Sequence, residues 1–300
     1  MKRLSCMMLV AASCSLPFAE QRKQDSAVTA LPLLALLGAV SGSSVSCSSL
    51  SASTPSGTAA ADRITSAPGD AGSGFFDARC SIDGVRGMGD NQGSTDVFSL
   101  AATGSSSVLV LEWNGKKITN GVGADFIVFE NSFNQNGNAT TRFMEPVIVE
   151  VSYDGSHWCG FNPIYSSGTY SQNPANWTRF AGTTNSYFNQ DSNFMNATTL
   201  FTSGSSGGGG DQFDLSNLVT GATSGYNCSA VASNSGCAAG DVSQLQGTSS
   251  GQGVVYVRMI AATACTNPNA GGATFPQDSG AYGGGPDMDG VIARNVVSRP

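Results

Sequence analysis

Carboxylate and amide side chains stand at the ends of two apolar segments of this chain, and their oxygens suit a hard cation. Asp125, Glu130 and Asn131 bound the first segment, and Asp287 and Asp289 open the second. Oxygen ligands of this kind bind Ca²⁺, and residues two apart lie on one side of a strand. Asp and Asn at strand ends also make turn hydrogen bonds without a metal. The sequence therefore leaves open a calcium site and a set of turn contacts.

Carboxylates could also act in glycoside hydrolysis, which needs two of them across a cleft, about 5 to 9.5 Å apart. Glu130, Glu145, Asp287 and Asp289 supply the groups, but no pattern places two of them on opposite sides of a cleft. The single histidine, His157, follows a turn, and no serine has the strand, turn and helix context of a nucleophile elbow. No phosphate-binding glycine motif occurs. We expect a protein without catalytic activity.

Aromatic residues lie scattered through a segment rich in Asn, Ser, Thr and Gly between residues 161 and 210. They include Tyr165, Tyr170, Trp177 and Tyr187. Aromatic rings beside polar amides can stack on sugar rings or anchor a protein partner. They can equally serve to fold long loops onto the domain. These four residues are the candidate ligand-binding side chains.

Five cysteines lie in the body of the chain, at positions 80, 159, 228, 237 and 265. Disulfides form in exported proteins, and Cys228 and Cys237 enclose a short Gly, Ser and Asn loop that a bridge would fix. We predict this pair, and the sequence does not decide how Cys80, Cys159 and Cys265 pair. Zinc is disfavoured because no CxxC or HxxxH spacing occurs.

Two short apolar runs near the start each follow basic residues and end near a cysteine preceded by small residues. This pattern resembles a bacterial lipobox, in which the cysteine is acylated and becomes the first mature residue. Cys14 has the better preceding residues. Cleavage at Cys47, however, removes the apolar run LPLLALLGAV, so we predict acylation at Cys47. One alternative is acylation at Cys14, and the other is a plain secreted protein without acylation. Neither run reaches the ~18–20 apolar residues of a membrane span.

This assignment divides the chain into three parts. Residues 1–46 form a signal or leader region, residues 47–61 a polar and flexible tether, and residues 62–297 a single domain. Acyl chains at the cysteine would make the membrane a partner of the protein.

Hydrophobic periodicity predicts β-strands throughout the domain. In 126–129 both faces are apolar, as in a central strand covered above and below. Residues 146–153 alternate instead, which predicts an antiparallel strand with Glu150 and Ser152 on a solvated face. Asn114-Gly115 and Asp154-Gly155 indicate two-residue hairpin turns. Further strands are expected at 253–260 and 286–293, and no helix of convincing length is expected. The fold class is therefore an all-β antiparallel β-sandwich with long loops, in which Ser203–Gly210 is a flexible connection.

Charge narrows the choice of partners. Only 12% of the 300 residues are charged, about half the usual ~25% for soluble domains. Past residue 46, 10 Lys and Arg face 19 Asp and Glu, without a basic run that could neutralise phosphates. Nucleic acid is thus excluded as an expected partner. The acidic balance suits divalent cations, and it also serves simple solubility.

Five motifs in order resemble a family of bacterial exported cell-surface proteins. They are NGxGxDFxVFEN, EPxxVEVSxDGxxW, DxFDL, YVR and DxDGV, found here between Asn120 and Val291. The CGFNP and DGVIAR segments are most similar to the spirochaetal, leptospira-type lipoprotein branch. The resemblance covers about residues 62–295 and implies a jelly-roll sandwich similar to galactose-binding-like domains. It implies no activity.

These observations together predict a non-catalytic lipoprotein displayed at the outer membrane or cell surface. Its expected role is a binding or adhesion module for a glycan or a host or matrix protein. A structural envelope lipoprotein without a specific ligand is the alternative, and a glycan-active hydrolase is a more distant one.

Overall fold

The computed structural model describes Cys47 and residues 51–221, 225–231, 237–276 and 284–299. Contacts within the chain separate residues 1–44 from a second unit, residues 45–300, which contains every element described below. The predicted leader and Cys14 lie outside the described residues. Within the described residues, no helix has the length and apolar character that a membrane crossing requires.

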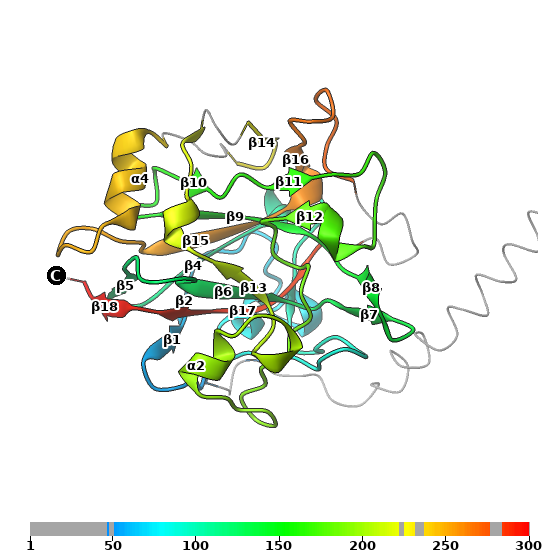
Figure 1. The fold of residues 1–300 in the computed structure, drawn as a ribbon, viewed down its shortest axis with the longest axis horizontal. Coiled ribbons are helices and arrows are strands. Elements are labelled where there is room, and N and C mark those ends of the chain that lie inside the picture. The colour runs from blue at the N-terminus through cyan, green and yellow to red at the C-terminus, as the bar shows by residue number, and fades with distance from the viewer. Residues whose placement is uncertain (1–46, 48–50, 222–224, 232–236, 277–283, 300) are drawn as a thin grey trace, which may run out of the picture. The chain divides into compact units, whose positions relative to one another are not determined.

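Two five-stranded antiparallel sheets form the body of the second unit (Figure 1). The first sheet has the order β1 (Thr58–Ala60), β17 (Asp287–Arg294), β6 (Phe126–Glu130) and β13 (Asp211–Phe213), with β3 (Phe98–Ser99) also paired to β17. The second has the order β10 (Cys159–Gly160), β9 (Val147–Ser152), β15 (Tyr256–Ala261), β4 (Val108–Glu112) and β2 (Arg63–Ser66).

Among the described residues, short pairs of strands and the helices α2 and α4 accompany these sheets. The pairs are β5 (Lys116–Ile118) with β18 (Val296–Ser298), β7 (Phe133–Gln135) with β8 (Asn138–Phe143), β11 (Ile164–Tyr165) with β12 (Trp177–Thr178), and β14 (Asn227–Cys228) with β16 (Cys265–Thr266). The helices are α2 (Ala197–Leu200) and α4 (Ala239–Gln246), besides single 3₁₀ turns. The predicted all-β class and antiparallel pairing are confirmed.

A single hydrophobic core joins the inner faces of the two sheets. It includes Phe126 and Val128 of β6 together with Val149 of β9 and Met259 of β15. The alternate residues of β6, Ile127 and Phe129, pack in a separate cluster on the outer face of the first sheet. The prediction that this strand is central and covered on both faces is confirmed. Phe188 and Leu200 of α2 supply the outer cover. Helix α2 is at the bottom of Figure 1.

The predicted solvated face of β9 is wrong, because all six residues of this strand are buried. Glu150 is fully buried and forms an ion pair with Arg258 on the neighbouring strand β15. The Tyr226 hydroxyl donates to Glu150 Oε1 at 2.6 Å. Trp158 stacks on the Arg258 guanidinium, with 4.1 Å from Cζ to the ring centroid. Aromatic side chains therefore cover the face of β9 that the alternation of apolar and polar residues predicts to be exposed to solvent.

The two predicted hairpins differ from their expected forms. Asn114-Gly115 forms a turn with a positive φ of 65° at Gly115, but β5 pairs with β18 rather than with β4. At Asp154-Gly155 the hairpin does form, since Cys159 pairs with Val151. Its loop is longer than two residues, since the pairing resumes only at Cys159. Within the loop, the backbone amides of Ser156 and His157 donate to Asp154 Oδ1.

The predicted flexible connection at Ser203–Gly210 is also wrong, because its second half is buried. Gly209 and Gly210 have φ of 66° and 63°, and their backbone lies against strand β6 and the 185–187 segment. A Cβ at Gly209 would lie 2.0 Å from the Asn185 carbonyl oxygen. Glycine is used here for close approach of two backbones rather than for flexibility.

The ordered domain begins earlier than residue 62, so the predicted tether at 47–61 is corrected. Residues Thr58–Ala60 form β1, which pairs in register with Ala293 and its neighbours in β17. The Trp113 indole nitrogen donates to the Ala59 carbonyl oxygen at 3.0 Å. Ordered backbone hydrogen bonds of this kind exclude a free linker at these positions.

Three disulfides cross-link the described residues: Cys47–Cys80, Cys159–Cys237 and Cys228–Cys265. The predicted Cys228–Cys237 pair is therefore wrong, because β14 places Cys228 opposite Cys265 of β16. Cys47 is 2% exposed and its sulfur is bonded to Cys80, so the structure also contradicts acylation at Cys47. Sequence separation did not indicate these pairs, since partners lie 33 to 78 residues apart.

The packing of the glycine run predicts a graded effect of adding one methyl group. We expect Gly209→Ala to lower the free energy of unfolding by about 2–4 kcal/mol, because it combines a positive φ with overlap against the Asn185 carbonyl. Gly204→Ala is the matched control, since Gly204 has a similar φ of 72° but open space around it. It should cost only about 1 kcal/mol. Urea unfolding measures both, and equal losses would contradict the packing argument.

Candidate functional site

The five residues predicted to bind a metal lie in three different places. Asp125 is fully buried at the start of β6, where it accepts from the Gly121 and Leu215 amides at 2.8 and 2.9 Å and from Asn295 Nδ2 at 3.1 Å. Glu130 ends the same strand five residues later, which corresponds to roughly 16 Å of extended chain. One ion cannot contact both carboxylates. The predicted role of Asp125 as a ligand of the same ion is therefore wrong, and it fixes a turn.

Asp289 lies apart from Asp287, although the two residues are in one strand. The register of β17 against β6 shifts between Met288 and Gly290. This bulge interrupts the alternation that predicted a shared direction for the two carboxylates. Both Asp289 oxygens accept from the Arg86 backbone amide, at 3.0 and 3.3 Å. Asp289 therefore belongs to a separate group of acidic residues.

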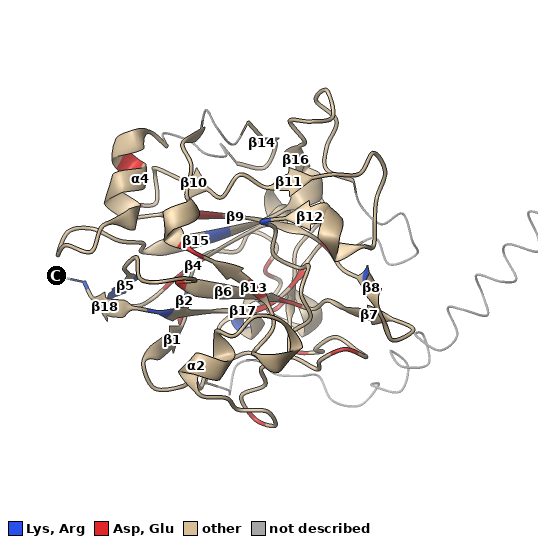
Figure 2. Cartoon of the chain, in the orientation of Figure 1, with Lys and Arg blue, Asp and Glu red and all other residues tan. Residues whose placement is uncertain are grey.

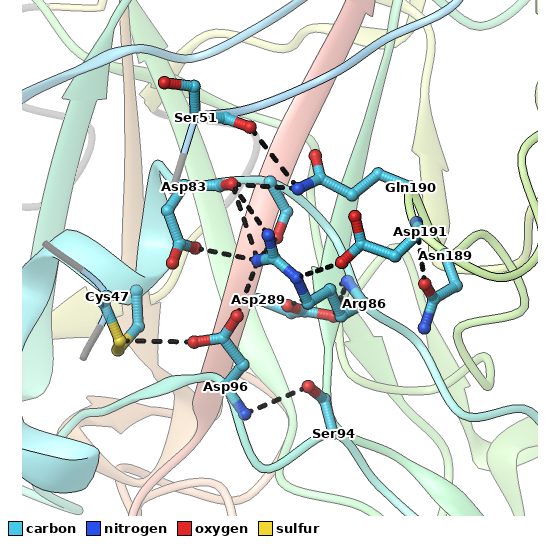
Figure 3. Close-up of polar contacts among 12 residues, drawn as sticks. Cys47, Ser51, Asp83, Arg86, Ser94, Asp96, Asn189, Gln190, Asp191 and Asp289 are labelled. Atoms are coloured by element: carbon cyan, nitrogen blue, oxygen red, sulfur yellow. Dashed lines mark hydrogen bonds and ion pairs between the residues drawn. A yellow bond between two sulfur atoms is a disulfide. The ribbon is translucent and has the colours of Figure 1, made fainter. Parts of the chain in front are cut away.

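That group, which we call the Arg86 cluster, consists of one guanidinium and four carboxylates (Figure 3). Arg86 Nη1 contacts Asp96 Oδ2 at 2.6 Å and Asp83 Oδ1 at 3.4 Å, while Nε contacts Asp191 Oδ2 at 2.7 Å. Asp289 approaches from the Arg86 backbone side. Asp83, Asp96 and Asp289 are at most 5% exposed. Burial therefore concentrates negative charge around a single cation.

The electrostatics of the Arg86 cluster shift its carboxyl groups towards the protonated form. Burial, and then the charge of Asp96, raises the pKa of Asp83 to about 7, although Arg86 opposes this. Burial also raises the pKa of Asp289 well above its usual value. Both oxygens of Asp83 lack a hydrogen-bond partner. One guanidinium does not compensate for this many buried carboxyls.

The Cys47–Cys80 disulfide borders the Arg86 cluster. The Cys47 sulfur lies 3.2 Å from Asp96 Oδ1. The two sulfurs and one Asp96 oxygen lie within 4.8 Å of one another, a spacing suited to metal ligands. Thiolates are the form of cysteine that binds metals, and the disulfide removes them. The disulfide therefore holds Cys47 beside the Arg86 cluster and leaves neither Cys47 nor Cys80 as a thiolate ligand.

The remaining predicted ligands, Glu130, Asn131 and Asp287, do come together where β6 ends and β17 begins. Met288 pairs with Glu130 across the two strands. Asn131 Nδ2 donates to Asp287 Oδ2 at 3.3 Å, and the Ser99 hydroxyl donates to Asp287 Oδ1. We call these three residues, with the following Ser132 and the nearby Glu145, the Glu130 cluster. The antiparallel pairing of β6 with β17 brings these residues together, because the end of β6 lies beside the start of β17.

Negative charge at the Glu130 cluster is dense. Burial raises the pKa of Glu130 well above its usual value, and the charges of Glu145 and Asp287 add to this effect. Burial raises the pKa of Asp287 as well. Backbone amides of Asp287 and Asn131 oppose the shift of Glu130 but do not overcome it. The Glu130 carboxylate therefore faces two other carboxylates at the end of the sheet.

The four aromatic residues predicted to bind a ligand are packed into the protein instead. Tyr165 and Trp177 are 4% and 3% exposed, and their ring centroids lie 4.0 Å apart. The Tyr170 hydroxyl donates to the Met144 carbonyl oxygen at 2.9 Å. The Tyr187 hydroxyl donates to Asp90 Oδ1 at 2.6 Å, and burial raises the pKa of Tyr187 to about 12. Tyr165, Tyr170 and Trp177 pack in the cluster on the outer face of the second sheet, and Tyr187 packs against Gly209. The structure therefore does not support an exposed stacking platform.

A small hollow opens beside the Glu130 cluster. It is lined by Met144, Glu145, Pro146, Tyr170, Thr263, Pro276, Gly285 and Pro286. Glu145 belongs to both the hollow and the cluster, and Pro286 directly precedes Asp287. The hollow thus lies next to the buried carboxylates.

Sequence reasoning missed the Arg86 cluster. Its members Asp83, Arg86, Asp96 and Asp191 lie in loops, where no periodicity marks a charged residue as buried. The signal available was the DGVR segment upstream of the first predicted strands. Figure 2 shows that charged residues are few and spread over both sheets, so a local concentration of acids is unusual for this chain.

The chain was compared with protein-family models, with curated proteins and with solved structures, and none of the three comparisons gave a match.

The Arg86 cluster predicts a pH-dependent stability with a defined sign. The folded pKa of Asp83 is about 7 against 3.8 for the ordinary side chain, so the folded state retains a proton that the unfolded state has lost. The free energy of unfolding should therefore fall as pH rises from about 4 to 7 and level off above this range. We expect Asp83 to contribute about 2–4 kcal/mol of the change.

Urea unfolding at pH 5 and pH 8 measures this contribution. Asp83→Asn, which cannot titrate, should reduce the difference in stability between the two pH values. Asp62→Asn, a change of the same size outside the Arg86 cluster, is the control and should keep the wild-type difference. An Asp83→Asn variant with the full wild-type pH dependence would show that Asp83 is ionised throughout in the folded protein.

Proposed function

We propose that this chain is an exported, non-catalytic β-sandwich protein that acts as a binding or adhesion module at the outer membrane or cell surface. The observation that carries the proposal is the set of three disulfides in the described residues. Disulfides persist in oxidising compartments outside the cytoplasm. Six cysteines form these disulfides with partners 33 to 78 residues away, which fits a protein that folds after export.

The finer fold that we propose is a jelly roll of the galactose-binding-like kind. Support comes from the two five-stranded sheets and from the antiparallel pairing of the strands described. The resemblance of the motifs around β6, β9 and β17 to bacterial exported cell-surface proteins points the same way. Domains of this architecture present their loops at the ends of the sandwich, where ligand contacts form.

A binding role accounts for the carboxylates better than catalysis does. A general acid or base must reach the substrate, and Glu130 and Asp289 are 2% and 0% exposed. His157 is held by Asp154 at 2.7 Å and lies 3.3 Å from the Tyr153 hydroxyl, neither of which is a serine nucleophile. The ligand we propose is a glycan or an extracellular protein. Because the loop aromatics are packed inside, a glycan would be recognised by polar groups rather than by stacking on Trp177.

Membrane attachment in this proposal uses Cys14. The sulfur of Cys47 is bonded to Cys80 in a disulfide, and Cys14 is the alternative lipobox cysteine. A structural envelope protein without a specific ligand is the second candidate function, favoured by the small size of the hollow beside Glu145.

Two cysteine variants test export and attachment in the full chain expressed in a lipoprotein-processing bacterium. Cys14→Ala should move the protein from the detergent phase to the aqueous phase, because it removes the acylated residue. Cys47→Ala should remain in the detergent phase but lose about 2–4 kcal/mol of stability with its disulfide. Release by Cys47→Ala alone would place the anchor at Cys47. Peptide mapping without reductant should recover the three disulfide pairs.

Binding is tested with the oxidised domain on arrays of glycans and matrix proteins. We expect saturable binding to one class of ligand and no turnover of chromogenic glycosides. Absence of binding across both arrays would favour the structural envelope role. Hydrolysis that is lost in Glu145→Gln would instead favour an enzyme.

A further inference from the structure

The Glu130 cluster contains buried oxygens without a hydrogen-bond partner among the residues that the structure describes. Glu130 is 2% exposed, and its Oε2 has no hydrogen-bond partner. The side-chain oxygens of the next two residues, Asn131 Oδ1 and Ser132 Oγ, are also buried without a partner. A buried acceptor left without a partner destabilises the folded state, and more so when it is charged. Three consecutive residues with such oxygens therefore require an explanation.

Glu130 and Asp287 lack a neutralising cation among the described residues, whereas two other groups of buried acids contain one. Glu150 is paired with Arg258, and the Arg86 cluster contains a guanidinium. Among the residues that the structure describes, no ion pair joins Lys, Arg or His to Glu130 or to Asp287. The Glu130 and Asp287 carboxylates thus meet where β6 ends, and no described cation is paired with either of them.

The surrounding backbone holds the Glu130 side chain in place. A Cβ at Gly182 would lie 3.2 Å from Glu130 Oε2 and 2.6 Å from the Glu145 carbonyl oxygen. Gly182 has a φ of 81°, so the close approach needs glycine. Similarly, a Cβ at Gly93 would lie 2.0 Å from Asn131 Oδ1. The oxygens are therefore enclosed by main chain, which fixes their positions.

The chemistry of these donors selects the type of cation. Carboxylate, amide and hydroxyl oxygens are hard ligands, which Ca²⁺ binds in flexible arrangements of six to eight. No histidine or cysteine belongs to the cluster, which argues against zinc and copper. Magnesium requires a stricter octahedral geometry and retains more of its water. The hollow beside the cluster is lined by Glu145 and by Pro286, which directly precedes Asp287.

We propose that the end of β6 is a calcium site in which Glu130, Asn131 and Asp287 bind the ion, with Ser132 and Glu145 at its edge. The site goes beyond the proposed binding function, which does not depend on a metal. Calcium would connect β6 to β17 and to the chain before β9, and so fix the end of the sandwich beside the hollow. Two members of the sequence-predicted set, Asp125 and Asp289, are excluded from it.

The test uses the full oxidised chain and compares thermal unfolding with calcium and with a chelator. At a calcium concentration about 100 times the dissociation constant we expect the Tm to rise by about 5–10 °C. Equal concentrations of Mg²⁺ should give a clearly smaller shift. Isothermal titration of the protein with CaCl₂ should give one site per chain. An unchanged Tm together with no heat of binding would overturn the proposal.

Two isosteric variants assign the site to these residues. Glu130→Gln should be at least as stable as wild type in chelator, because it removes a buried charge, yet it should lose the calcium shift. Asp287→Asn should lose the shift as well. The matched controls are Asp125→Asn and Asp289→Asn, which replace excluded carboxylates and should retain the calcium shift even if their basal Tm falls. A full calcium response in both Glu130→Gln and Asp287→Asn would overturn the assignment.

Discussion

Burial of the central strands on both faces is the constraint on which the rest of this structure depends. The inner faces of β6, β9 and β15 share one core, while aromatic and aliphatic side chains from the loops cover their outer faces. Such packing removes water from every polar group on these strands. Each polar side chain there must then find its partner within the protein, because an unpaired buried charge is costly.

The buried acids meet this requirement in different ways. Glu150 receives a guanidinium from Arg258 and a hydroxyl from Tyr226. Asp125 receives backbone amides, and Asp289 receives the Arg86 amide. Glu130 differs because it lies near the charges of Glu145 and Asp287, and its Oε2 has no hydrogen-bond partner among the described residues. The contrast with Glu150, which is equally buried, is what makes the Glu130 cluster informative about an external ion.

Covalent and loop contacts hold the cover over the sheets. Cys159–Cys237 joins β10 to the segment before α4, and Cys228–Cys265 joins β14 to β16. Trp177 and Tyr165 pack in the same cluster as Cys228 and Cys265. These long loops contain few regular backbone hydrogen bonds. Disulfides and buried aromatic rings therefore hold them in place on the sheets. The aromatic residues are thus structural in this arrangement rather than exposed for a ligand.

The sequence by itself determined the local structure. Apolar residues on both faces of 126–129 identified a central strand. The sequence also named Glu130, Asn131 and Asp287 among five candidate ligands, but the pairing of β6 with β17 selected these three. Tertiary structure alone decided what lies opposite each residue. Alternation in β9 did not reveal that loops bury Glu150, and glycine composition did not reveal the close packing at Gly209. Cysteine pairing and the Arg86 cluster depend on contacts between distant segments, which local periodicity does not encode, because it reports which face a side chain takes and not what covers that face.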